Sequence, residues 1–461
     1  MPSNRFMHLV ATRLVATLLA GAGLLLPGVP HAAAIRTAAT APAMRGATLV
    51  SAAVPMVSDT LRFEPARVAS PDSSEHSLRL EREPASVEDE WLEAPFGDDL
   101  LTDLDQWRQH GKSRTDEDVI LDYNRVDQLR LGVRGEYGAR EGLEPRLGAR
   151  FEYAFGRDRP LYGFQVEQPL VESGRFALGA SFTRRTDHSE LQQIQDYENS
   201  LALLFGRSDY RDYFEREGAD AYAMWRVPDF STISVHLRED EYRSLGLLRG
   251  TRSWFHSDRA LRDNPAIDAG DTRTVTLRLE RLAHRSSRTH AGFYHWLEVE
   301  RAGAGLGGDF EYTRGLADLR SVLRLSPATT LSLRAVAGST FAGTLPRQKE
   351  FTAGGVDGLR GHSFSAYRGD QIALAQAEYT VGLWRIASDL FEGGLHAIVF
   401  LDMGRAWSNP DGRYDASRQA MQADGGFGFS TSEENVRLYL ARNLQQPDSD
   451  FVVSLRLERP F

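Results

Sequence analysis

Residues 128–137 read QLRLGVRGEY, a stretch in which apolar and polar side chains alternate almost strictly. Apart from one glycine on each face, the odd-numbered positions carry Leu, Leu, Val and Tyr, and the even-numbered positions carry Gln and charged residues. Successive side chains of a β-strand point to opposite faces, so this spacing predicts a strand with one apolar and one charged face. Residues 146–155 and 274–280 repeat the pattern. From about residue 125 onward the chain is therefore predicted to be all-β.

The alternation leaves open which face meets solvent. A soluble sandwich also alternates, but one domain seldom needs about 340 residues of it. A transmembrane barrel reverses the arrangement, with apolar side chains toward lipid and charged ones toward a wet lumen. The length of the alternating region, together with the predicted export and the C-terminal residues described below, favours an apolar face that meets lipid. We expect an all-β, transmembrane antiparallel β-barrel over residues 121–461.

Counting alternating segments predicts about 16 strands. The weakest is Leu201–Phe205, which is retained because a single-chain bacterial barrel with both ends in the periplasm needs an even number of strands. This count places the long segments 244–271, 343–369 and 408–424 outside the cell. The predicted strand centres lie near residues 131, 149, 164, 180, 202, 223, 236, 277, 294, 319, 333, 376, 399, 428, 438 and 456.

The N-terminus predicts export. Arg5 and Arg13 precede an apolar run, Leu14–Leu26. The run ends at Pro27, and small residues follow it. The run is shorter than the ~20 residues of a membrane-spanning helix, so residues 1–34 are interpreted as a signal peptide. Residues 35–120 are predicted to be a polar periplasmic linker, or a segment that plugs the lumen.

Composition excludes several classes of protein. Cysteine is absent, so no disulfide or cysteine metal site is available. The net charge is −10, and loss of Arg5 and Arg13 with the signal peptide would make it −12, which argues against nucleic acid as a partner. The twelve histidines show no close metal-ligand spacing. Residues 361–365 read GHSFS and lack the last glycine of a hydrolase elbow. We expect no enzyme activity, no cofactor and no metal.

The C-terminal residues 451–461 read FVVSLRLERPF. Leu455, Leu457 and Phe461 share the apolar face of this predicted strand, and the chain ends on an aromatic residue. The segment resembles the signal by which the barrel assembly machinery recognises outer-membrane barrels. The resemblance implies a location in the bacterial outer membrane, with membrane lipid and that machinery as partners. The alternative is an ordinary edge strand that ends in Phe.

A more specific resemblance lies in residues 351–362, FTAGGVDGLRGH. This stretch looks like the inward-folded loop of the BamA/TamA-like bacterial surface antigen superfamily, whose hallmark is Gly-Gly, a short spacer, then aliphatic-Arg-Gly-aromatic. The chain departs from the hallmark at His362, where Tyr or Phe is usual. The residues that match or replace the hallmark are Gly354, Gly355, Gly358, Leu359, Arg360, Gly361 and His362.

Residues 400–404, FLDMG, resemble the Phe-x-Asp-x-Gly strand of the same family, so the resemblance spans roughly residues 122–461. Phe400, Asp402 and Gly404 share one face, which puts the carboxylate in the lumen. An unpaired guanidinium in a narrow lumen carries a desolvation cost, so Arg360 needs a partner there. Asp402 is one candidate partner and Glu378 is another. The alternative is a solvated external loop in which Arg360 has no role.

Members of this superfamily insert or translocate other proteins, which implies a weak seam between the first and last strands and an unfolded protein client. In such barrels POTRA modules usually receive the client, but residues 35–120 leave no room for a tandem array. Three hypotheses stay open. The barrel is an insertase or translocase working without those modules, a passive pore gated by the inward loop, or a surface protein whose outer loops, such as residues 251–256, bind a partner.

Overall fold

The computed structural model describes residues 115–457 with short gaps. The predicted signal peptide, residues 35–114 of the predicted linker or plug, and Phe461 lie outside the described residues. Within the described part, none of the helices combines the length and the apolar character that crossing a membrane requires. The gaps are residues 139–141, 228–230, 256–258, 282–290, 304, 327, 389–390, 410–413, 417–418, 432–435 and 447.

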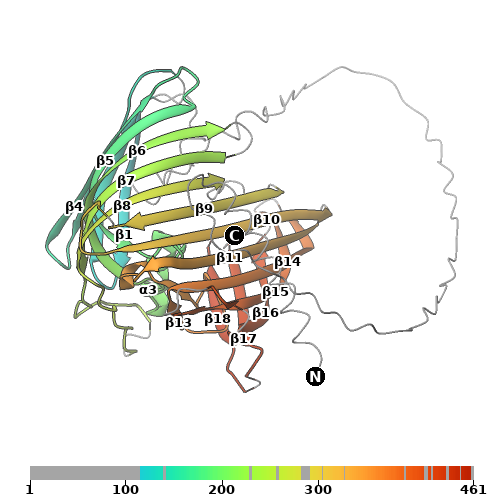
Figure 1. Cartoon of the computed structure of the whole chain (residues 1–461). Helices are drawn as coiled ribbons and strands as arrows, with labels where there is room; N and C mark the ends of the chain where they lie inside the picture. The colour runs from blue at the N-terminus through green and yellow to red at the C-terminus, as the bar shows by residue number, and fades with distance from the viewer. Residues whose placement is uncertain are drawn as a thin grey trace, which may run out of the picture. The chain divides into compact units, whose positions relative to one another are not determined.

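Sixteen strands form the main sheet, and each pairs with its neighbours in chain order (Figure 1). The pairing is antiparallel throughout, as in a barrel built from successive hairpins. The strands are β1 (Thr115–Asn124), β2 (Gln128–Tyr137), β3 (Arg146–Ala154), β4 (Arg159–Pro169), β5 (Phe176–His188), β6 (Tyr213–Val227), β7 (Ser231–Ser244), β8 (Gly270–Arg281), β9 (Gly292–Ala302), β10 (Tyr312–Ser326), β11 (Thr329–Gly343), β14 (Gln371–Ser388), β15 (Phe391–Trp407), β16 (Gln422–Thr431), β17 (Arg437–Asn443) and β18 (Val452–Arg456).

The two faces of the strands differ as the alternation predicts. In β2, Val133 is 58% exposed, whereas Arg130 is 5% exposed. The exposed positions of the strands are largely Leu, Val and Phe, and the covered positions carry Arg, Glu, Asp and Gln. This inversion of the usual soluble pattern confirms an all-β transmembrane barrel with an apolar outer surface and a charged interior.

One predicted strand is wrong. Residues around Leu201–Phe205 belong to the helix α3 (Asp196–Gly206). The apolar run Leu-Ala-Leu-Leu-Phe does not alternate, Ala and Leu favour helices, and Asp196 and Glu198 place negative charge in the first turn. The helix ends at Gly206, and the next residue, Arg207, caps it with a left-handed backbone (φ 53°) and an N–H that bonds to the oxygen of Leu203.

The strand that restores the even number is β1, which precedes the expected barrel start at residue 121. Its register pairs Thr115 with Tyr137 and Asn124 with Gln128. The acidic start TDED and an apolar Ile120 on the inner side obscure its alternation. Val119 and Leu121 are nevertheless exposed on the outer face, as in the other strands. The other fifteen predicted centres lie within strands.

The segment between β11 and β14 folds back against the barrel wall. It contains a 3₁₀ turn, η3 (Arg347–Lys349), and a two-stranded hairpin of β12 (Phe351–Ala353) and β13 (Tyr367–Gly369). The hairpin lies against β14 and β15. We call residues 351–369 the inward loop.

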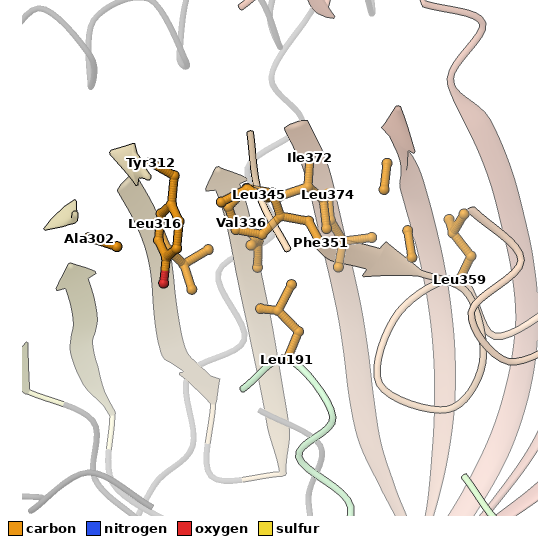
Figure 2. Close-up of a cluster of buried hydrophobic side chains, with 12 residues drawn as sticks. Leu191, Ala302, Tyr312, Leu316, Val336, Leu345, Phe351, Leu359, Ile372 and Leu374 are labelled. Atoms are coloured by element: carbon orange, nitrogen blue, oxygen red, sulfur yellow. The ribbon is translucent and has the colours of Figure 1, made fainter. Parts of the chain in front are cut away.

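An apolar cluster joins the inward loop to the inner face of the wall (Figure 2). Phe351 and Leu359 of the loop pack with inner-face residues of β10, β11 and β14, including Leu316, Val336 and Leu374. The predicted polar interior is therefore apolar at this level, because the loop replaces water there and dry packing is favourable. Further along β14, after Leu374, the inner face becomes polar, with Gln376 and Glu378.

Candidate functional site

The backbone of the inward loop turns at Gly354 and Gly355, whose φ angles are +119° and +86°. Such angles are strained for residues with a side chain, which explains the paired glycines. The Gly355 N–H bonds to the oxygen of Leu359 at 3.1 Å, and Leu359 is fully buried. The turn therefore presents the following residue, Arg360, at a defined position inside the barrel.

Arg360 forms a charged clamp with two strands. Its Nε and Nη2 donate to the two carboxylate oxygens of Asp402 in β15, at 2.8 and 2.7 Å. Its Nη1 donates to Oε2 of Glu378 in β14 at 3.0 Å. The side chain of Arg360 is 1% exposed and that of Asp402 is 0% exposed. Two parallel bonds to one carboxylate fix the orientation of the guanidinium as well as its place.

Aromatic rings complete the surroundings of Arg360. Its guanidinium carbon lies 3.7 Å from the ring centre of Phe400 and 4.8 Å from that of Tyr439. Burial alone would lower the pKa of Arg360, but Asp402 and Glu378 raise the pKa above its usual value. The guanidinium of Arg360 therefore stays charged inside the clamp.

Glu378 also connects the clamp to β17. Its Oε1 accepts a hydrogen bond from Arg437, and its Oε2 accepts one from the Tyr439 hydroxyl at 3.1 Å. Neither Arg437 nor Tyr439 was predicted from the sequence. Their alternation onto the charged face of β17 was the available signal, but nothing local indicated the contact with a strand about sixty residues earlier.

His362, the departure from the family hallmark, has its own partners. Its Nδ1 lies 3.0 Å from Oδ2 of Asp424 in β16, and its Nε2 lies 3.2 Å from Nδ2 of Asn443 in β17. The N–H of Gly361 donates to the same Asp424 oxygen at 2.6 Å. An aromatic hydrocarbon ring could not make these polar contacts, so the histidine suits this lumen.

The small residues of the motif lie where the backbone comes close to a neighbour. A Cβ at Gly361 would lie 2.8 Å from the carbonyl carbon of Arg442, and one at Gly404 would lie 2.5 Å from the oxygen of Ala373. A Cβ at Gly358 would lie 3.0 Å from the Gly354 nitrogen. A side chain at Gly361 would push the loop away from the wall, and one at Gly404 would push β15 away from its neighbour β14.

Asp357 at the loop tip connects three further parts of the protein. Its Oδ1 accepts from Arg456 in β18 at 2.9 Å, and its Oδ2 accepts from the N–H of Ile194 at 3.0 Å. Its backbone oxygen accepts from Arg334 in β11 at 3.1 Å. Neither Asp357 nor Arg456 was predicted from the sequence as a site residue. Through them the inward loop contacts the last strand of the barrel.

Of the predicted C-terminal recognition signal, Leu455 and Leu457 are among the described residues. Leu455 is exposed on the outer face of β18, whereas Ser454 and Arg456 are buried on the inner face. Leu457 follows the strand, and its N–H donates to Oε1 of Glu198 at 2.9 Å. Phe461 lies outside the described residues.

Glu190, Glu298 and Glu300 bring carboxylate oxygens close enough together to ligate a metal ion. Protein cations already lie among them, however. Arg314 Nη2 is 2.8 Å from Glu190 and 3.2 Å from Glu298, and Lys349 Nζ is 3.1 Å from Glu300. The cluster is therefore an ion-pair network between the wall and the loops.

The comparisons with known proteins agree with this architecture. The Omp85 superfamily domain matches residues 141–437, more than half of the chain. BamA from Haemophilus ducreyi lacking POTRA domains 1-3 has a TM-score of 0.51 at 12% identity, over 75% of this chain and 69% of that chain. At that identity the likeness concerns the fold alone. No curated protein matches the sequence.

Two further solved structures are similar over most of this chain. CdiB from Escherichia coli has a TM-score of 0.42 at 11% identity, over 75% of this chain and 62% of that chain. CdiB from Acinetobacter baumannii has a TM-score of 0.39 at 12% identity, over 74% of this chain and 59% of that chain. The chain thus spans about three fifths of either CdiB structure. From the domain match and the barrel fold, this chain belongs to the Omp85 superfamily and is a β-barrel protein of the bacterial outer membrane.

Proposed function

We propose that this barrel inserts or translocates other proteins, and that the inward loop, anchored by Arg360, couples the lumen to the last strand. Membership of the Omp85 superfamily supports the general role. Its clients would be unfolded outer-membrane or secreted polypeptides, and its own assembly would use the barrel assembly machinery. The role needs no cofactor and no catalytic residue, so we propose a non-enzymatic function.

The observation that carries the proposal is the buried clamp between Arg360, Asp402 and Glu378. A loop that only covered the outside of a barrel would not need a fully desolvated ion pair, because exposed pairs contribute little. The same loop contacts Arg456 of β18 through Asp357. Movement of the last strand would therefore disturb the loop, which is a useful connection for a barrel that opens at its seam.

A passive pore is the second candidate. The charged interior favours it, since ion-conducting barrels have polar lumens. The inward loop would then act as the gate. The two candidates differ in their conductance, because an insertion barrel with a fixed loop should conduct little, whereas a pore should conduct steadily in planar bilayers. Among the described residues, no particular contact favours a surface-binding role.

Site-specific photo-cross-linking tests the insertion role. A photoreactive amino acid at Val119, on the outer face of the edge strand β1, should cross-link nascent barrel proteins in cells. The matched control is Leu277 on β8, which is also exposed on the outer face but lies in the middle of the strand order, far from the seam. Equal cross-linking from both positions, or none from Val119, would contradict the proposal. Steady conductance of the unaltered protein would favour the pore.

A further inference from the structure

Among the described residues, no register pairs β1 with β18, so these strands are the two edges of the sheet. An unpaired strand edge is costly inside a membrane, because hydrocarbon offers no partner to a backbone N–H. A seam in the wall therefore needs partners from elsewhere in the chain. Helix α3, which lies in the segment between β5 and β6 (Figure 1), supplies partners to two N–H groups, one at each edge.

Polar side chains of α3 bond to both edges. Ser200 Oγ accepts from the N–H of Tyr123 in β1 at 2.8 Å and donates to Oδ1 of Asp122 at 2.7 Å. Glu198 accepts from Arg456 Nε at 2.7 Å and from the N–H of Leu457 at 2.9 Å, at the end of β18. Two residues of one helical turn thus bond to backbone N–H groups at opposite sides of the seam.

The other face of α3 is apolar and exposed. Tyr197, Leu201 and Phe205 are spaced four residues apart, so they form one stripe along the helix. Glu198 and Ser200 are buried on the opposite side, together with Asn199. A helix with polar residues inside and apolar residues outside has the same inverted pattern as the strands of the barrel wall.

Contacts of the neighbouring loop place this stripe on the outer side of the barrel. The Phe205 ring packs against the rings of Trp254 and Phe255, with centroid distances of 4.8 and 6.2 Å. The same loop reaches Tyr123 of β1, whose hydroxyl donates to the oxygen of Arg252 at 3.0 Å. Tyr123 shares the outer face of β1 with the exposed Val119 and Leu121. The aromatic cluster is therefore continuous with the lipid-facing surface of β1.

We propose that α3 is part of the lipid-facing wall: it fills the seam between β1 and β18, and its stripe of Tyr197, Leu201 and Phe205 contacts lipid acyl chains. A helix is about 10 Å wide, whereas paired strands are about 4.8 Å apart, so α3 replaces direct pairing of the edges. The seam then opens when a few side-chain bonds break, without the loss of a strand ladder. This inference concerns the wall alone and stands whatever the barrel transports.

Lipid contact can be measured with a nitroxide on a single cysteine, because the chain has no cysteine of its own. The full-length protein, reconstituted in phospholipid vesicles, would carry Leu201→Cys. Leu121→Cys on the outer face of β1 is the lipid control, and Arg249→Cys in an exposed loop is the water control. The readouts are collision rates with oxygen, which concentrates in lipid, and with a water-soluble nickel chelate. Heat-modifiable mobility in gels would verify that each variant is folded.

The expected result is that Leu201→Cys matches the lipid control, with oxygen collisions several-fold more frequent than nickel collisions. Tyr197→Cys, on the same stripe, should give the same ratio and serves if the first variant does not fold. A ratio like that of Arg249→Cys would overturn the proposal, because the stripe would face water. Shielding from both reagents would overturn it as well, since protein rather than lipid would then cover the stripe.

Discussion

The clamp of Arg360 makes a quantitative prediction. Arg360→Met removes the guanidinium but keeps a long apolar stem, so the loss concerns the charge and its bonds. Asp402 would keep Gln376 Nε2 at 3.2 Å, whereas Glu378 would keep Arg437 and Tyr439. Removal of one partner of a buried ion pair costs about 3–5 kcal/mol. We expect Arg360→Met to lower the free energy of unfolding by that amount, mainly because Asp402 loses its charged partner.

A double-mutant cycle separates the interaction of Arg360 with Asp402 from the other effects of each substitution. Arg360→Met, Asp402→Asn and the double variant would be unfolded with guanidinium chloride in lipid vesicles, followed by the fluorescence of the seven Trp residues. The coupling between Arg360 and Asp402 should be at least about 1.5 kcal/mol, as for other close charge pairs. The coupling to Glu378 should be smaller, because it rests on one bond and Glu378 has a second cation. Exchange of the charges of Arg360 and Asp402 is a weaker test, since Glu378 would then repel the new carboxylate.

A matched control distinguishes anchoring of the loop from general stability. Arg278 makes a comparable pair with Glu298, but only between the strands β8 and β9. Val356→Cys at the buried loop tip reports the loop position through its rate of labelling by a thiol reagent. Arg360→Met should accelerate labelling, and Arg278→Met should not. The reasoning is refuted if the Arg360 and Asp402 coupling is below about 0.5 kcal/mol, the error of additivity, or if labelling is unchanged.

Three further substitutions test single contacts, two through the same unfolding assay and one through the labelling rate of Val356→Cys. His362→Phe restores the usual family residue but removes a polar partner of buried Asp424, so it should destabilise the barrel by about 1–3 kcal/mol; a gain in stability would contradict the assignment. Gly361→Ala places a Cβ 2.8 Å from the Arg442 backbone and should raise the labelling of the loop tip; an unchanged rate would show that the wall yields easily. Ser200→Ala leaves an edge N–H of β1 without its partner and should lower stability by about 1–3 kcal/mol, and no change would mean that this bond is dispensable.

The faces of the strands were predictable from the sequence alone. In β15, Val399 and Leu401 are exposed on the outer face, whereas Phe400 and Asp402 are buried on the inner face. This assignment needs only the two-residue period of an extended chain and knowledge that one face meets lipid. The same period, with the required even number of strands, predicted sixteen strands. The Gly-Gly turn came from a family resemblance over roughly residues 122–461, whose sharp motifs lie in the last third of that stretch, and the candidate partners of Arg360 came from the cost of burying an unpaired guanidinium.

Local pattern failed where two structures compete for one apolar run. Leu201–Phe205 was interpreted as a strand because the even strand count required one, but it belongs to α3, whose Ser200 and Glu198 bond to β1 and β18. The true first strand was missed because Ile120 interrupts its alternation. In both cases the secondary structure depends on the strand edges at the seam. These edges, β1 and β18, come from opposite ends of the described chain.

The sequence by itself thus determined that this chain forms a barrel, which side chains face lipid, and that a glycine-rich loop carries a charge needing a buried partner. Only the tertiary structure decided that Asp357 meets Arg456, that His362 meets Asp424 and that α3 lies at the seam. The physical reason is the range of the interactions. The direction of a side chain follows from its immediate backbone, whereas contacts between residues about 60 to 260 positions apart follow from the register of every strand that separates them.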